Sequence, residues 1–88
     1  MFRVFLSNSS QKGYDRTEPK IKARLDELFE ILTFKPVPAD LFDVTKVSGS
    51  ESNYRVRITH IRVVYSIRWH ENEIRIHDID KKKDRTYR

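Results

Sequence analysis

The chain has 88 residues, of which 35% are charged and 38% are hydrophobic, and it contains no cysteine. This length accommodates one small domain over residues 1–88, and the lack of cysteine excludes a disulfide framework, a zinc–thiolate site and a thiol nucleophile. No apolar run approaches the roughly 20 residues that span a bilayer, and the apolar part of residues 1–6 is too short for a signal peptide. We therefore expect a soluble, cytoplasmic protein with no membrane partner.

The excess of positive charge lies entirely in the second half of the chain. Residues 1–44 carry seven basic and seven acidic side chains, whereas residues 45–88 carry eleven basic and six acidic side chains, which accounts for the net charge of +5. Such asymmetry indicates a polyanionic partner, either nucleic acid or an acidic protein. Charge that serves only solubility is the alternative.

The first half of the chain predicts a strand and a main helix. Phe2, Val4 and Leu6 alternate with Arg3 and Phe5, which predicts an opening strand that is buried on one face and partly on the other. Residues 7–13 are small and polar, so we expect only one short capped turn there, beginning near Ser7 or Ser9. Thr17 offers an N-cap for the main helix, which ends before the Pro-Val-Pro sequence. The buried stripe of that helix is expected to comprise Ile21, Leu25, Leu28, Phe29 and Leu32.

From residue 42 onward the apolar period changes to two, which predicts four antiparallel strands. The expected strands are residues 43–47, 54–58, 61–69 and 74–77. Thr59 and His60 form a tight connection; because neither Thr nor the following Ile favours a positive φ, a longer or bulged hairpin is the alternative. The predicted fold class is α+β: a short N-terminal strand, one or two helices, and an antiparallel four-strand meander with the helix packed on one sheet face.

Strand alternation predicts a cluster of arginines on the sheet face opposite the helix. Arg55, Arg57 and Arg62 fall on neighbouring strands, where cross-strand side chains lie about 5 Å apart and diagonal ones about 7–8 Å. We expect Arg75 and His77 on the same face. Guanidinium groups this close repel one another unless an anion bridges them, and their planar fork matches phosphate. A solvated polar face is the alternative.

Two further features favour RNA as the anion. Residues 54–70 contain no acidic side chain, and the C-terminal segment is basic with a tyrosine near its end. Basic groups beside a stackable ring are typical of single-stranded RNA sites. The candidate RNA-binding residues are Arg75, His77, Lys81, Lys82 and Lys83.

The order and spacing of these motifs resemble the RelE/ParE toxin superfamily, and the archaeal RelE proteins most closely. The matching pieces are Pro-Val-Pro at 36–38, Phe-Asp-Val at 42–44, Lys46, Gly49, and the strand pair at 54–58 and 61–65. The resemblance implies a toxin of a type II toxin–antitoxin pair that cleaves mRNA in the ribosomal A site without a metal or other cofactor. The implied chemistry is attack of a 2′-hydroxyl on the adjacent phosphate. The implied partners are a cognate antitoxin, mRNA, and the ribosome with the RNA of both subunits at the A site.

The resemblance also implies catalytic roles for particular residues. Arg55, Arg57 and Arg62 correspond to basic residues that grip the phosphate and stabilise its developing charge. Arg85 belongs to a second basic pair, with Lys83, and Tyr87 corresponds to a tyrosine that orients or stacks on the nucleotide.

The general base is not assigned by the resemblance. Guanidinium does not release its proton near neutral pH, so an arginine site has no evident base. The candidates are Lys81, Lys82, Lys83, His77 and Tyr87. A two-histidine arrangement of His60 and His77 is a further alternative.

Two other functions stay open at this level. A ParE-like toxin would act on gyrase by binding, and its arginine face would be dispensable. A decayed, non-catalytic toxin would bind RNA or a partner, and Tyr87 could then be replaced freely. Any of these toxins implies a neutralising partner, which we expect to be an acidic, amphipathic antitoxin.

Overall fold

The computed structural model describes residues 1–81, so the predictions for Lys82, Lys83, Arg85 and Tyr87 lie outside the described residues. The elements in chain order are β1 (Arg3–Leu6), α1 (Asn8–Asp15), α2 (Pro19–Leu32), β2 (Asp43–Lys46), β3 (Asn53–Ile58), β4 (Ile61–Arg68) and β5 (Glu73–Lys81). The predicted α+β class is confirmed. Within residues 1–81, no helix has the length and apolar character needed to cross a bilayer.

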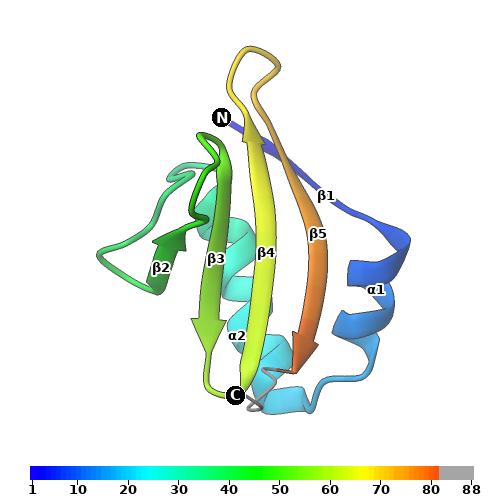
Figure 1. Cartoon of the computed structure of the whole chain (residues 1–88). Helices are drawn as coiled ribbons and strands as arrows, with labels where there is room; N and C mark the ends of the chain where they lie inside the picture. Colours follow the sequence, from blue (N-terminus) through cyan, green and yellow to red (C-terminus); the bar gives the residue numbers. More distant parts are fainter. Residues whose placement is uncertain (82–88) are drawn as a thin grey trace.

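The strands form a five-stranded sheet in the order β1-β5-β4-β3-β2 (Figure 1). Strands β2 to β5 make the predicted antiparallel meander, and β1 lies parallel to β5. Since β1 and β2 occupy opposite edges, the chain must cross the sheet between them. Helix α2 makes this crossing on one side of the sheet, behind β3 and β4 in Figure 1.

The core lies between α2 and the sheet. The buried side chains of α2 are Ile21, Leu25, Leu28 and Leu32, as the periodicity predicts, and Phe29 is partly buried. They pack against the inward residues of β3, β4 and β5: Val56, Ile58, Ile61, Val63, Tyr65, Ile67, Ile74, Ile76 and Ile79. The residues between these point to the other side, which no helix covers within residues 1–81. We call that side the open face.

Helix α1 is longer than the single turn predicted from the sequence. Ser7 is its N-cap, as expected, and its Oγ accepts a hydrogen bond from the backbone N–H of Ser10 at 3.0 Å. The helix then continues to Asp15 alongside the part of β5 that lies beyond β1 (Figure 1). The fully buried Ser10 hydroxyl donates to the Ile76 carbonyl at 3.0 Å. Contacts with β5 thus override the weak helix propensity of Ser, Asn and Gly in this segment.

The start of α2 differs from the prediction by one residue. Glu18, not Thr17, is the N-cap, and Pro19 is the first helical residue. The hydroxyl of Thr17 instead donates to the Tyr14 carbonyl at 2.8 Å. Thr17 therefore closes the end of α1 and does not cap α2.

The substitution Gly13→Ala is expected to lower the free energy of unfolding by about 2 kcal/mol, although alanine favours helices. A Cβ at Gly13 would overlap the carbonyl oxygen of Ile79, so α1 would have to move away from β5. Urea unfolding measures the effect, with Lys12→Ala on the exposed side of α1 as the control. Unchanged or increased stability of the Gly13 variant would contradict this close packing.

The β3–β4 connection is the tight two-residue turn predicted from the sequence. Ile58 pairs directly with Ile61, and Thr59 adopts a positive φ of 51° to close the turn. Positive φ is unusual for a β-branched residue. The longer or bulged hairpin is therefore wrong at this position.

The irregularity of the sheet lies on β5 instead. Val64 of β4 pairs with Asp78, whereas the next residue, Tyr65, pairs with Ile76. His77 is the extra residue of a β-bulge, a feature that re-aims side chains. It lies on the open face, where its Nε2 is 2.8 Å from the Ser66 hydroxyl.

Candidate nucleic-acid interface

Three arginines lie together on the open face, as the alternation of β3 and β4 predicts. Val56 and Ile58 are buried against the helix side, so Arg55 and Arg57 point the other way. In the register of the two strands Arg57 lies directly opposite Arg62, and Arg55 is the diagonal neighbour of Arg62. The short turn at residues 59–60 fixes this register.

The three arginines line one shallow cavity of about 160 Å³, together with Asp43 and Thr45 of β2. We call this the arginine cavity. Arg55 and Arg62 are partly buried, and neither forms an ion pair with any residue of the range 1–81. Partly buried cations without an acidic partner leave their charge available to an anion.

Arg57 differs from the other two because it has an acidic partner on the neighbouring strand. Asp43 lies opposite it, and its Oδ2 atom accepts a hydrogen bond from Nε of Arg57 at 3.2 Å and forms an ion pair with Nη2 at 3.2 Å. Sequence reasoning missed this pair because it considered acidic residues only within residues 54–70. The pair could have been identified from the alternation of β2, because Asp43 and Thr45 fall on the same face as Arg57 and Arg55 of β3.

Two further carboxylates flank the cavity from β5 without entering its lining. Asp80 lies opposite Arg62 in the register, and its Oδ1 accepts from the backbone N–H of Lys81 at 2.8 Å. Asp78 lies opposite Val64, and its Oδ1 accepts from the Ser9 hydroxyl at 3.2 Å. The open face is therefore less uniformly basic than the sequence of β3 and β4 indicates.

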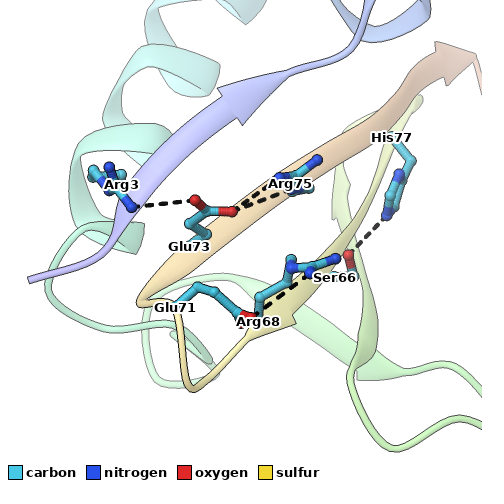
Figure 2. A network of polar contacts seen from close by, with 7 residues as sticks. All are labelled: Arg3, Ser66, Arg68, Glu71, Glu73, Arg75 and His77. Atoms are coloured by element: carbon cyan, nitrogen blue, oxygen red, sulfur yellow. Dashed lines mark hydrogen bonds and ion pairs between the residues drawn. The ribbon is translucent and has the colours of Figure 1, made fainter.

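Arg75 and His77 lie on the open face as predicted but outside the arginine cavity: Arg75 belongs to a network of ion pairs near the β4–β5 turn, whereas His77 contacts Ser66 farther along β5 (Figure 2). Glu73 joins Arg75 at 3.0 Å to Arg3 at 3.2 Å. Arg68 pairs with Glu71 at 3.7 Å in the same region. Because these cations already have carboxylate partners, this network is less suited to phosphate than the arginine cavity.

The structure does not bring Lys81 or His60 into the arginine cavity. Both line a different cavity of about 410 Å³ beside Gly13 and Ile21. Lys81 pairs with Ile61, a residue of the helix side, and His60 contacts Thr59 through Nδ1 at 3.3 Å. His77 lies apart from His60. It is four positions before Lys81 along β5, a distance of ~13 Å, and Lys81 is the residue that shares a cavity with His60. This placement does not favour the two-histidine alternative.

The strands that carry the arginines are anchored from the helix side by Tyr65. Its hydroxyl donates to the Pro36 carbonyl at 2.8 Å, and its ring stacks on Tyr54 with centroids 5.8 Å apart. Burial, and to a lesser degree Tyr54, raises the pKa of Tyr65 far above its ordinary value. Tyr65 thus stays protonated and fixes β4 to the Pro-Val-Pro connector, opposite the arginines.

Among residues 1–81, no group of three or more His, Asp or Glu side chains is arranged to hold a metal ion. The described chemistry of the arginine cavity consists of guanidinium donors, the Thr45 hydroxyl and the Asp43 carboxylate.

Comparison with known proteins finds the same fold in several toxins, although no family model matches the chain. A protein of Methanocaldococcus jannaschii that carries the toxin name RelE1 is 32% identical over 82 residues, which cover 93% of this chain and 91% of that protein. The structure is similar to the archaeal RelE–RelB complex from Pyrococcus horikoshii, with a TM-score of 0.86 and 29% identity over 96% of this chain and 98% of that chain.

The isolated RelE toxin of Escherichia coli has a TM-score of 0.80 over 97% of this chain and 88% of its own. At 12% identity this likeness concerns the fold alone. The archaeal relative, in contrast, matches in sequence along nearly its whole length. The family that the order of sequence motifs predicts is confirmed: the chain belongs to the RelE toxin family.

Proposed function

We propose that this chain is the toxin of a type II toxin–antitoxin system and that it cleaves mRNA in the A site of the ribosome. The observation that carries the proposal is the arginine cavity, in which Arg55, Arg57 and Arg62 line one space of about 160 Å³. Cleavage of RNA by its own 2′-hydroxyl passes through a phosphorane-like state with extra negative charge on the phosphate oxygens. Fixed guanidinium groups stabilise such charge without reorganising.

The mRNA and the ribosomal RNA are the proposed nucleic-acid partners, and the cytoplasm is the proposed site of action because translating ribosomes are there. Arg75, His77 and Ser66 extend the open face beyond the cavity and are proposed to contact flanking RNA. The proposed roles of Lys83, Arg85 and Tyr87 at the nucleotide rest on the family resemblance. Lys81 and Lys82 are proposed to bind RNA because the C-terminal segment is basic.

The protein partner is proposed to be a RelB-type antitoxin. The solved complex from Pyrococcus horikoshii contains such a partner. In this chain a groove of about 630 Å³ runs between α2 and β2, with the half-exposed Leu41 and buried Phe42 beside Lys20 and Arg24. Two carboxylates also belong to this lining. The apolar surface suits an amphipathic segment, whose acidic side chains could pair with Lys20 and Arg24.

The proposed activity is tested with ribosomes stalled on a defined mRNA with an empty A site. After addition of the purified chain, primer extension should show a new mRNA end within the A-site codon. The folded protein leaving the mRNA intact would overturn the proposal, and inhibition of gyrase by the same preparation would then favour the ParE-like alternative.

A further inference from the structure

The proposed reaction needs a group that takes the proton of the attacking 2′-hydroxyl, and none of the three arginines can accept it. We propose that the carboxylate of Asp43 is this general base. The inference rests on the proposed function and assigns a role to a residue that the sequence motifs leave without one.

Among the described residues, the lining of the arginine cavity contains one side chain suited to act as the base. Five side chains of residues 1–81 line the cavity, of which three carry guanidinium groups and one is Thr45 with its hydroxyl. Asp43 is the remaining side chain, and its carboxylate has only acceptor oxygens, whereas the guanidinium groups have only donors. A proton acceptor beside phosphate-binding groups is the arrangement that this reaction requires.

Four other carboxylate or imidazole groups on the sheet or its turns have contacts outside the arginine cavity. Asp80 and Asp78 accept hydrogen bonds outside the cavity, from the Lys81 backbone and from Ser9. His60 lines the cavity beside α1, and His77 is joined to Ser66 in the bulge of β5.

The contacts of Asp43 leave one of its oxygens available. Both contacts with Arg57 are made by Oδ2, at 3.2 Å, and Oδ1 has no hydrogen-bond or ion-pair partner within residues 1–81. The side chain is 55% exposed, so an RNA strand on the open face can reach it. The pairing with Arg57 holds the carboxylate beside the guanidinium that is proposed to bind the phosphate. A ribose whose 3′ phosphate is bound there would have its 2′-hydroxyl near the carboxylate.

The chemical step balances within the RNA and this carboxylate. Oδ1 takes the proton of the 2′-hydroxyl, and the freed oxygen lone pair forms the new 2′-O–P bond. The P–O5′ bond breaks, and its electron pair leaves with the 5′ oxygen, which takes a proton from water. The products are a 2′,3′-cyclic phosphate and a 5′-hydroxyl, and the protonated Asp43 returns its proton to solvent.

The test compares Asp43→Asn with Asp40→Asn on stalled ribosomes. The side-chain amide introduced by Asp43→Asn keeps an oxygen that can accept from Arg57 but takes no proton, and the loss of one negative charge favours binding of a polyanion. Asp40 pairs with Lys35 and lies outside the arginine cavity, so its replacement makes the same change in charge as a control. Circular dichroism and thermal unfolding verify that both variants are folded.

We expect single-turnover cleavage by Asp43→Asn to be at least about 100-fold slower than by the wild type, which is the usual contribution of a general base. Affinity for ribosomes that carry a non-cleavable 2′-deoxy mRNA should stay equal or increase. The Asp40 variant should cleave at the wild-type rate. Imidazole in solution should restore part of the activity of Asp43→Ala, because the vacated space admits an external base.

Two results would overturn the assignment. Cleavage at the wild-type rate by the Asp43→Asn protein would remove the carboxylate from the reaction. A loss of affinity that equals the loss of rate, with no rescue by imidazole, would reduce Asp43 to a support for Arg57. Failure of the proposed function itself is recognised separately, because the wild-type chain would then leave the mRNA intact.

Discussion

Replacing Arg62 with alanine is expected to slow A-site mRNA cleavage at least about tenfold, or about 1.4 kcal/mol of transition-state stabilisation. Arg62 is partly buried, faces Arg57 across the β3–β4 register and has no ion-pair partner within residues 1–81. Its charge is therefore free to meet the charge that develops on the phosphate. Single-turnover cleavage on stalled ribosomes measures the loss, and the melting temperature should not fall because the side chain lies outside the core.

The matched control for this prediction is Arg68→Ala. Arg68 belongs to the same strand and the same face, but it pairs with Glu71 at 3.7 Å near the other end of β4. Its removal changes the net charge equally and should leave the cleavage rate near that of the wild type. Equal losses in the two variants would mean that general attraction to RNA, and not the arginine cavity, explains the effect.

Replacing Leu25 with alanine is expected to lower the free energy of unfolding by about 3 kcal/mol. Leu25 is fully buried in the middle of α2, where it belongs to the core between helix and sheet. Such a loss is a large part of the roughly 5–15 kcal/mol that stabilises an ordinary domain. Urea unfolding measures it, and Glu30→Ala on the exposed side of α2 is the control with little expected change.

The Leu25 variant also separates stability from chemistry. Helix α2 lies on the face of the sheet opposite the arginines, so the arginine cavity should be intact in every folded molecule. At a temperature well below its melting transition, the variant should cleave mRNA at the wild-type rate per folded molecule. A large fall in that rate under those conditions would show that α2 contributes to the site directly.

The elements that sequence reasoning predicted well are those whose periodic pattern coincides with burial. The stripe of α2 from Ile21 to Leu32 and the alternation of β3 and β4 each place apolar side chains at fixed intervals. These patterns follow from the helix and strand periods alone. They also predict that Arg55, Arg57 and Arg62 share one face, which the register confirms.

Features that depend on contacts between distant segments could not be predicted in the same way. Helix α1 owes its length to β5, through the Ser10 hydroxyl on the Ile76 carbonyl, and no local pattern announces that contact. The bulge at His77 depends on how β5 pairs with β4. The pairing of Asp43 with Arg57 depends on the register of an edge strand that the sequence places only approximately.

The proposed mechanism is that the arginine cavity holds an RNA phosphate while the neighbouring 2′-hydroxyl attacks it. Removing that hydroxyl tests the mechanism most directly. Two mRNAs are placed on stalled ribosomes, identical except for a single 2′-deoxy nucleotide on the 5′ side of the mapped cut. We predict that the chain cuts the unmodified mRNA to a 2′,3′-cyclic phosphate and leaves the 2′-deoxy mRNA intact. Cutting of both mRNAs at the same position and rate would contradict the mechanism.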